Sequence, residues 1–318
     1  MGQNYPNVAT NAGSETKNVE NLKTRVDSVR SCFSGTAPPT GNIVDGQFYY
    51  DTANKKLYEL HGTEWLPITA ILKNKLFYKN LVITNDDTTP TTKLDITADF
   101  ISCVGYSTSS LSKTLDTAGT GVNGLDTGSL ASNTWYYIYL IIDLGSSAIG
   151  TSPTFNTLLS LNSTSPTLPS GYDYSVRIGA IRTKSTVEEF RQFYQSDNSV
   201  YYTNTSIVDT PSDADCNVLL AGTVTTFTNV ANLGKSVPYT GTAYLSRNVR
   251  MLSNLGAGSS MFVRPASVNT AIGGVKLHAT TGWIQSEVPC SSTGLEYKVG
   301  GTTPSGTLYV IGYNDIIG

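Results

Sequence analysis

The sequence predicts a mainly β protein, with a short N-terminal helix, a small β-meander and then a large β-sandwich or jelly-roll-like domain. Three observations predict this fold. Short aromatic and aliphatic runs recur between clusters of Gly, Pro, Asn and Asp, the pattern of strands joined by turns. Helical periodicity occurs in one segment near the N-terminus. Charged residues are 14% of the 318 residues, against about 25% in typical soluble domains, so the surface depends on hydroxyl and amide groups.

The helix is expected over residues 15–33, after an extended polar arm at residues 1–13. Ser14 or Thr16 can cap its first turn, and Gly35 lies just beyond its end. Its apolar residues recur at spacings of three and four, as in a heptad seam: Val19, Leu22, Val26, Val29 and Phe33. The seam covers about two heptads, fewer than the three or four that define a coiled coil. Two interpretations stay open: an oligomeric bundle, which we favour, and an amphipathic helix packed on its own domain.

A small β-meander is expected over residues 36–69. Apolar runs at 46–51, 57–60 and 65–68 are separated by a polar turn and by a turn at His61-Gly62. The chain accordingly divides into three expected parts: residues 1–35, 36–69 and 70–318.

The meander segment also carries a resemblance. Residues 35–65 read GTAPPTGNIVDGQFYYDTANKKLYELHGTEW. This run resembles a module found near the N-terminal end of many bacteriophage fibre and appendage proteins, in which EGQ, three aromatic residues and Asp precede NKKL and a Trp. Asp45 stands where the module usually has Glu, and the run covers 31 of the 318 residues.

The remaining chain reads as strands. The clearest is Lys93–Phe100, where polar residues alternate with a buried face made of Leu94, Ile96, Ala98 and Phe100. The segment 135–142 is apolar on both faces, so we expect a strand between two packed layers or at a subunit interface. Residues 105–134 are expected to form short strands joined by turns, and residues 145–171 a long loop.

Further strands are expected toward the C-terminus. Residues 174–183 form one, with Val176, Ile178 and Ala180 on one face. Arg177 and Arg182 lie five apart on it and are expected on opposite faces, as structural or interfacial partners. A hairpin at 190–202 follows, and then strands near 218–228, 242–252, 260–264, 275–279, 283–288, 295–299 and 307–313.

Part of this region carries a second resemblance. Residues 135–140 read WYYIYL, residues 166–172 read PTLPSGY, residues 177–183 read RIGAIRT and residues 190–193 read FRQF. This order is similar to a β-domain common in phage and prophage fibre-like proteins. The prolines at 166 and 169 fix φ and favour a rigid turn in any case.

Composition and charge exclude several classes of partner. The net charge of −3 and the pI near 5.4 give no basic stripe, so we expect no nucleic-acid binding. The longest apolar run, 135–142, is far short of the roughly 20 residues of a membrane helix, so we expect no membrane insertion. The polar N-terminus shows no signal peptide, so we expect synthesis in a cytoplasm. Cys32, Cys103, Cys216 and Cys290 are far apart and are expected to be mostly buried thiols.

Catalysis is not expected, and no catalytic, cofactor or metal residue is assigned. His61 and His278 are the two histidines, which leaves little for a His-based triad or metal site. Carboxylates at 86/87, 188/189 and 213/215 stand in turn-like contexts, whereas a glycosidase needs two acids held apart across a sugar site.

The two resemblances imply a bacteriophage virion protein, either a tail fibre or a head fibre. Residues 1–18 would contact capsid, portal-vertex or tail proteins, and residues 19–33 would join three chains. The β domain would project outward and attach to a host-surface glycan or protein. Independently of the resemblance, the loops at 105–134 and 145–171 are the candidate contact regions. Two interpretations of these loops stay open, contact regions and solvated connectors, and no receptor-binding residue is assigned. Alternatives are a purely structural head fibre, adaptor or decoration protein and, less favoured, a glycan-degrading spike. The implied location is the virion, assembled in the cytoplasm of the host bacterium.

Overall fold

The computed structural model describes most of the chain beyond residue 33. The described residues are 34–38, 40, 47–53, 56–61, 64–67, 76–103, 106–143, 153–203, 216–267, 274–278, 282–301 and 304–317. The expected helix at 15–33, its apolar seam and the arm at 1–18 lie outside them. The chain divides into two compact units, Met1–Lys73 and Asn74–Gly318. The described residues are mostly β, which confirms the mainly β part of the predicted fold class.

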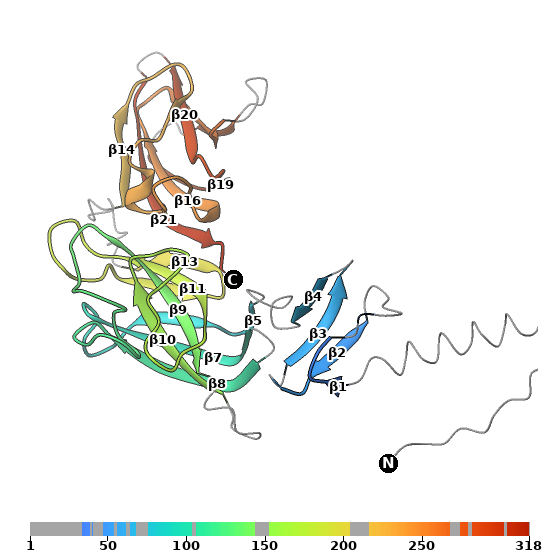
Figure 1. Cartoon of the computed structure of the whole chain (residues 1–318). Helices are drawn as coiled ribbons and strands as arrows, with labels where there is room; N and C mark the ends of the chain where they lie inside the picture. Colours follow the sequence, from blue (N-terminus) through green and yellow to red (C-terminus); the bar gives the residue numbers. More distant parts are fainter. Residues whose placement is uncertain are drawn as a thin grey trace, which may run out of the picture. The chain divides into compact units, whose positions relative to one another are not determined.

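Unit 1 contains the predicted meander as a four-stranded sheet of order β1-β2-β3-β4 (Figure 1). Its strands are β1 (Ser34–Gly35), β2 (Phe48–Asp51), β3 (Lys56–His61) and β4 (Glu64–Pro67). Tyr49 and Leu60 are buried, and the Tyr49 ring packs 5.7 Å from that of Trp65 and 6.1 Å from that of Tyr58. The aromatic residues that dominate this segment therefore make its small core.

Unit 2 is built on one antiparallel sheet of ten strands. Its order is β19-β16-β21-β13-β12-β6-β7-β5, with β14 beside β21 and β8 beside β7. The strands are β5 (Leu76–Lys79), β6 (Val82–Asn85), β7 (Lys93–Cys103), β8 (Tyr106–Asp116), β12 (Phe193–Ser196), β13 (Ser199–Tyr202), β14 (Asn217–Gly222), β16 (Ser246–Leu255), β19 (Gly282–Pro289) and β21 (Gly306–Asp315).

Two smaller sheets pack on this large one. The first has the order β10-β9-β11, from β9 (Trp135–Asp143), β10 (Thr154–Ser160) and β11 (Tyr174–Arg182). The second has the order β15-β20-β17-β18, from β15 (Thr228–Asn229), β17 (Ser259–Pro265), β18 (Val275–His278) and β20 (Leu295–Gly301). A 3-10 turn, η1 (Leu233–Lys235), is the one helical element that the structure describes in this unit.

Each small sheet forms a sandwich-like pair of layers with part of the large sheet. In the first sandwich, Ile138 and Leu140 of β9 share a core with Ile83 and Ile96. In the second sandwich, Met261 of β17 belongs to the same core and lies against Gly306 of β21. The large sheet thus supplies one layer to both sandwiches, and Figure 1 shows β13 and β21 where the two meet.

Strand β9 is buried on both faces, as its sequence predicts, and the structure decides between the two explanations. Its even-numbered residues face the large sheet. Its odd-numbered residues Tyr137, Tyr139 and Ile141 form a second cluster, against which Leu168 and Tyr172 pack. The proline-containing segment PTLPSGY therefore covers the outer face of β9, so β9 lies between two packed layers of its own chain.

Three local predictions are wrong. Residues 145–171 are not a continuous loop, because β10 forms there and is largely buried; its Asn, Thr and Ser residues concealed this. Phe100 is 40% exposed rather than buried. The alternation of buried and exposed residues along β7 changes phase at Asp99, which lies opposite Ser110, a residue with φ of 56°. Residues 106–116 form one long strand, β8, paired with β7 along its length, rather than several short strands.

A β-bulge in β11 corrects two more expectations. The register of β11 against β9 shifts between Arg177 and Gly179. The extra residue moves Ala180 to the outer face, away from Ile178, and places Arg177 and Arg182 on one face rather than opposite ones. The bulged Ile178 carbonyl accepts a hydrogen bond from Gln195 Nε2 at 2.8 Å. Gly179 permits this close approach, since a Cβ there would lie 2.6 Å from Gln195 Oε1.

Candidate functional site

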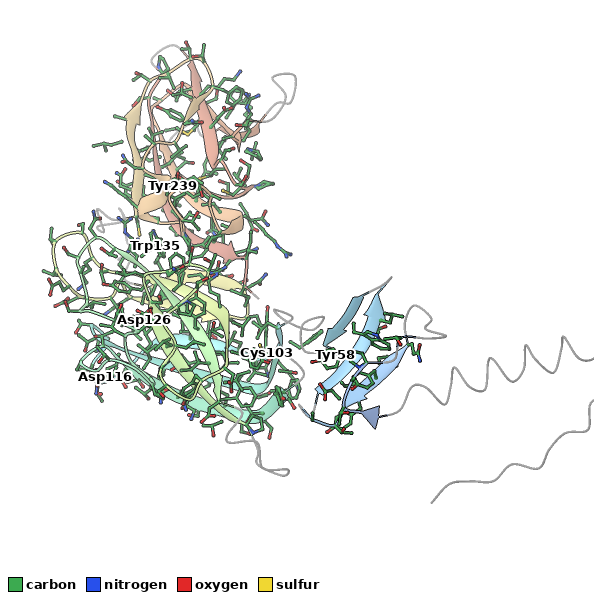
Figure 2. All side chains as sticks on the ribbon, in the orientation of Figure 1. Tyr58, Cys103, Asp116, Asp126, Trp135 and Tyr239 are labelled. Atoms are coloured by element: carbon green, nitrogen blue, oxygen red, sulfur yellow. The ribbon has the colours of Figure 1, made fainter. Side chains whose placement is uncertain are left out.

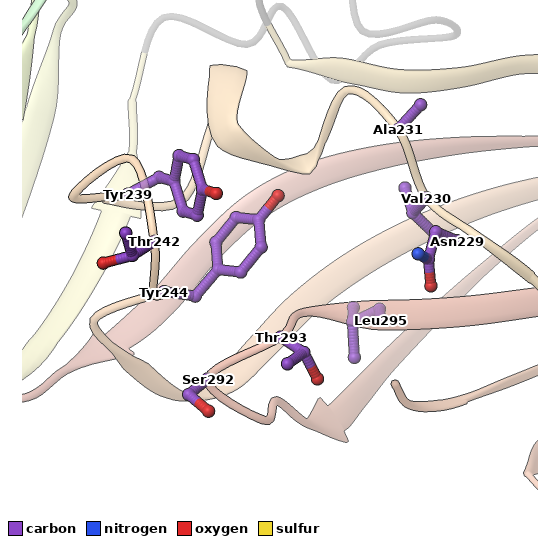
Figure 3. A pocket seen from close by; sticks show the side chains of 9 residues that line it. All are labelled: Asn229, Val230, Ala231, Tyr239, Thr242, Tyr244, Ser292, Thr293 and Leu295. Atoms are coloured by element: carbon purple, nitrogen blue, oxygen red, sulfur yellow. The ribbon is translucent and has the colours of Figure 1, made fainter. Parts of the chain in front are cut away.

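A pocket of about 280 Å³ opens at one end of the second sandwich (Figure 3). Three segments build it: the end of β15 and the residues after it, the loop before β16, and the turn between β19 and β20. The lining residues are Asn229, Val230, Ala231, Tyr239, Thr242, Tyr244, Ser292, Thr293 and Leu295.

Two tyrosines form one wall of the pocket. The rings of Tyr239 and Tyr244 lie 4.7 Å apart at an angle of 36°, and Figure 3 shows them facing each other. The Tyr239 hydroxyl donates to the Gly241 carbonyl at 2.6 Å, which closes the turn between them. Tyr239 is 37% exposed, so its ring is available to a ligand. Burial raises the pKa of Tyr244, so its hydroxyl stays protonated at neutral pH.

A glycine allows Tyr244 to occupy this position. Gly294 has φ of +99°, and a Cβ there would lie 2.7 Å from Tyr244 Cε2. The backbone of Tyr244 is also fixed, because its N–H donates to the Ser292 carbonyl at 2.9 Å. The tyrosine wall therefore depends on a residue without a side chain in the neighbouring turn.

The rest of the lining is polar but uncharged. Thr242, Ser292 and Thr293 contribute hydroxyl groups and Asn229 an amide, while Val230 and Leu295 provide apolar surface. Aromatic faces beside neutral donors and acceptors suit a ligand with hydroxyl groups and an apolar ring face, such as a sugar. The lining includes no carboxylate or histidine to perform acid–base chemistry.

Side chains of the first sandwich hold the segment that carries this pocket. We call the contacts with the backbone of residues 234–239 the junction. Trp135 Nε1 and Arg182 Nη1 donate to the Gly234 carbonyl at 2.7 and 3.0 Å. Further donors to this segment are Arg191 to Lys235, Tyr202 to Ser236 and Tyr137 to Tyr239, at 3.0, 2.6 and 3.1 Å. Figure 2 labels Trp135 and Tyr239, which lie on the two sides of the junction.

The junction gives a physical account of the second resemblance. Four of its five donors belong to the quoted segments: Trp135, Tyr137, Arg182 and Arg191. These polar side chains occupy a buried strand and its neighbours because backbone carbonyls of the second sandwich accept their hydrogen bonds. Arg177 instead pairs with the buried Asp315 at 2.9 Å.

The loops expected to contact a receptor are held by their own side chains. Asp126 Oδ2 accepts hydrogen bonds from Ser160 Oγ at 2.6 Å and from the Thr167 amide at 3.1 Å. Asn156 donates to the Tyr172 hydroxyl at 2.6 Å. These contacts link residues 117–134 and 161–173 to β10, and the pocket is not formed by either segment.

The structure gives Asp86 a role in a turn and Glu189 a role in an exposed ion pair. Hydrogen bonds from Thr88 and Thr89 lower the pKa of Asp86 to about 2. Glu189 pairs with Lys184 at 2.6 Å. Residues 213 and 215 lie outside the described residues, as do the predicted seam residues 19–33 and the side chains of His61 and His278. Among described residues, no three His, Cys, Asp or Glu side chains gather as metal ligands would.

The cysteines that the structure describes are free thiols. Cys103 and Cys216 are buried and Cys290 is half-buried, while Cys32 lies outside the described part. Burial raises the pKa of Cys103 to about 11 and that of Cys290 to about 12, so neither is a nucleophile at neutral pH. In the same part of the chain, no helix has the length and apolar character needed to cross a membrane.

Sequence reasoning did not identify the pocket residues. Nineteen tyrosines occur along the chain, and most of them suit a β core as well as a binding surface. A signal was present in the pattern YTGTAY at 239–244, where two tyrosines flank a glycine turn among threonines. The other lining residues come from 229–231, about 10 positions before the tyrosines, and from 292–295, about 50 positions after them, which no local pattern reveals.

Comparison with known proteins adds no family to these observations. No protein-family model matches the chain, and no curated protein matches it significantly.

Proposed function

We propose that this chain is a bacteriophage fibre protein that attaches the virion to a host-surface glycan. The single observation that carries the binding role is the tyrosine pocket, whose aromatic wall and neutral polar lining suit a sugar. The junction supports the binding role, because it fixes the backbone beside the pocket. Less conformational entropy is then lost when a ligand binds.

The virion assignment rests on the sequence. The run at 35–65 and the four segments between 135 and 193 resemble fibre proteins, and a charge-poor, Tyr-rich β chain fits that class. In this proposal residues 1–18 bind the capsid, portal vertex or tail, and residues 19–33 join three chains. The distal part is a sandwich or jelly-roll-like β domain, without enzymatic activity. Three copies would raise a weak single-site affinity by avidity, by roughly 100- to 10,000-fold if all sites engage.

The binding role is tested with the full-length chain on an array of neutral oligosaccharides and on intact bacteria. We expect saturable binding that Tyr239→Ala reduces at least tenfold, because the variant removes the exposed ring of the pocket. Tyr50→Ala is the matched control, since Tyr50 in unit 1 is also 37% exposed. Equal binding by wild type and Tyr239→Ala would refute the role of the pocket.

A purely structural fibre or adaptor is the second candidate, and one observation favours it. Tyr194 and Tyr201 pair across β12 and β13, and they are 40% and 41% exposed. Their exposure suits a face that another protein covers. In that case the full-length chain would show no saturable binding to host cells, while native mass measurement would still detect an oligomer.

A further inference from the structure

The outer face of the sheet β15-β20-β17-β18 carries alternating phenylalanines and lysines. Lys276 and Lys298 lie directly opposite Phe262, one on each neighbouring strand. Phe227 precedes Thr228, which pairs with Tyr297, so Phe227 lies beside Lys298. We call these four residues the lysine–phenylalanine row: Phe227, Lys298, Phe262 and Lys276.

Distances confirm that the row is in contact. Lys298 Nζ lies 4.8 Å from the ring centre of Phe227 and 5.0 Å from that of Phe262. Lys276 Nζ lies 5.9 Å from the Phe262 ring. The row faces outward, because the intervening residues Met261 and Val299 point into the core. It therefore presents two rings and two ammonium groups on a rigid sheet.

The row has an excess of positive charge. The one ion pair described on this face joins Arg264 to Glu296 at 2.9 Å, and Arg264 also stacks 3.7 Å from Phe227. Among described residues, neither Lys276 nor Lys298 has a carboxylate within ion-pair distance. The sequence segments 268–273, 279–281 and 302–303, which lie outside the described residues, contain no acidic residue. In a chain of net charge −3, this local excess favours an anionic ligand.

The alternation of aromatic rings and ammonium groups indicates which class of anionic ligand fits the row. Two strand spacings, about 10 Å, separate the backbones of the two lysines, with Phe262 between them. A uronic acid residue offers an apolar ring face to a phenylalanine and a carboxylate at its edge to a lysine. An acidic peptide or a polyphosphate supplies the charge without the ring face. The row thus matches a polymer of acidic sugars better than either.

We propose that the lysine–phenylalanine row binds carboxylated polysaccharide, as a second glycan subsite on the distal sandwich. This inference rests on the proposed function and extends it, because the tyrosine pocket is lined by uncharged groups whereas the row selects carboxylates. A single exposed ion pair adds little affinity, at most a few-fold. A polymer with a carboxylate on each unit offsets this weakness, because its adjacent units bind successive lysines.

The test measures binding of the full-length chain to immobilised polyuronate, with dextran as the neutral polymer and polyphosphate as the ring-free anion. We expect wild type to prefer polyuronate over both. Lys276→Gln with Lys298→Gln should reduce polyuronate binding roughly tenfold, which is the sum of two exposed pairs. Phe262→Leu should also reduce it while leaving weak polyphosphate binding unchanged. Added salt should weaken polyuronate binding, because it screens exposed charges.

The matched control is Lys79→Gln with Lys113→Gln. Lys79 is exposed like Lys276, and Lys113 is half-buried like Lys298, but both lie in the first sandwich. This control should bind polyuronate like wild type. The proposal is overturned if wild type binds polyuronate no better than dextran, or if the two double variants bind it equally. It is also overturned if polyphosphate binds as well as polyuronate and Phe262→Leu has no effect.

The outcome is separable from that of the proposed function. Tyr239→Ala should leave polyuronate binding intact and reduce neutral glycan and cell binding. If the chain shows no selectivity for polyuronate but its binding to cells still depends on Tyr239, only the role of the row is overturned. If it selects polyuronate but its binding to cells does not depend on Tyr239, the role of the pocket is overturned and the row remains as the glycan site.

Discussion

At the scale of single residues, one buried ion pair stands apart from the exposed ones. Arg177 Nη1 lies 3.0 and 2.9 Å from the two carboxylate oxygens of Asp315, whose side chain is fully buried. Burial raises the pKa of Asp315, because the nearby guanidinium offsets only part of the cost of removing the carboxylate from water. Removing the arginine alone would therefore leave a buried carboxylate without its cation, which destabilises the fold.

Arg177→Met should lower the free energy of unfolding by about 3–5 kcal/mol, because it leaves the Asp315 carboxylate buried without its cation. Urea denaturation measures this change. Lys184→Met is the control, since Lys184 and Glu189 are 34% and 40% exposed and such pairs contribute at most about 1 kcal/mol. Adding Asp315→Leu to Arg177→Met should restore part of the stability. Equal effects of the two single variants would contradict this account.

At the scale of elements, strand identity was readable from sequence but strand packing was not. Alternation and turn residues predicted β7, β11, the β12–β13 hairpin and the later strands, because each pattern is local. The bulge at Ile178 depends on Gln195, which lies on another strand, so no local pattern revealed it. The polar composition of β10 concealed a buried strand whose Asn156 and Ser160 are satisfied by hydrogen bonds.

The candidate site likewise depends on packing between strands, which local sequence patterns do not reveal. The tyrosine pocket combines three separate segments, and the lysine–phenylalanine row combines three strands and the residue before β15. Register alone brings Lys276 and Lys298 to the two sides of Phe262, and register is set by the fold of the whole unit. Sequence reasoning therefore led to a proposed binding role but did not identify the residues of the pocket or of the row.

Gly294→Ala should disrupt the tyrosine pocket. The new Cβ would lie 2.7 Å from Tyr244 Cε2, so the ring must move, and φ of +99° adds strain. Gly241→Ala is the matched control, since Gly241 has φ of +92° with nothing within 4 Å of the new Cβ. The positive φ should cost each variant about 1–2 kcal/mol of stability, and the clash with Tyr244 adds to the loss in Gly294→Ala. Only Gly294→Ala should reduce neutral glycan binding. Unchanged glycan binding by Gly294→Ala would contradict the assigned role of Tyr244.

At the scale of the whole of unit 2, the two sandwiches share a sheet and a junction. The sheet is continuous from β5 to β19, and the junction adds side-chain donors to the carbonyls of residues 234–239. Aromatic contacts accompany them, with the Tyr202 and Tyr313 rings 6.2 Å apart. These links predict that both sandwiches unfold together.

Tyr202→Phe should lower the free energy of unfolding by about 1–3 kcal/mol, because the buried Ser236 carbonyl loses its donor at 2.6 Å. Tyr201→Phe is the control, since the adjacent Tyr201 is 41% exposed. Differential scanning calorimetry should show one transition for unit 2 in both variants, shifted down only in Tyr202→Phe. Two separated transitions would contradict the coupling of the sandwiches.

The position of β21 has a consequence for how the molecule is made. This strand is the last one described in the chain, yet it lies between β13 and β16 and also pairs with β14. Until β21 has been made and docked, β13 and β16 each lack one neighbour, and their unpaired edges can pair with other chains. The large sheet is therefore completed only once β21 is available, and this step joins residues more than 100 positions apart, a separation that slows folding.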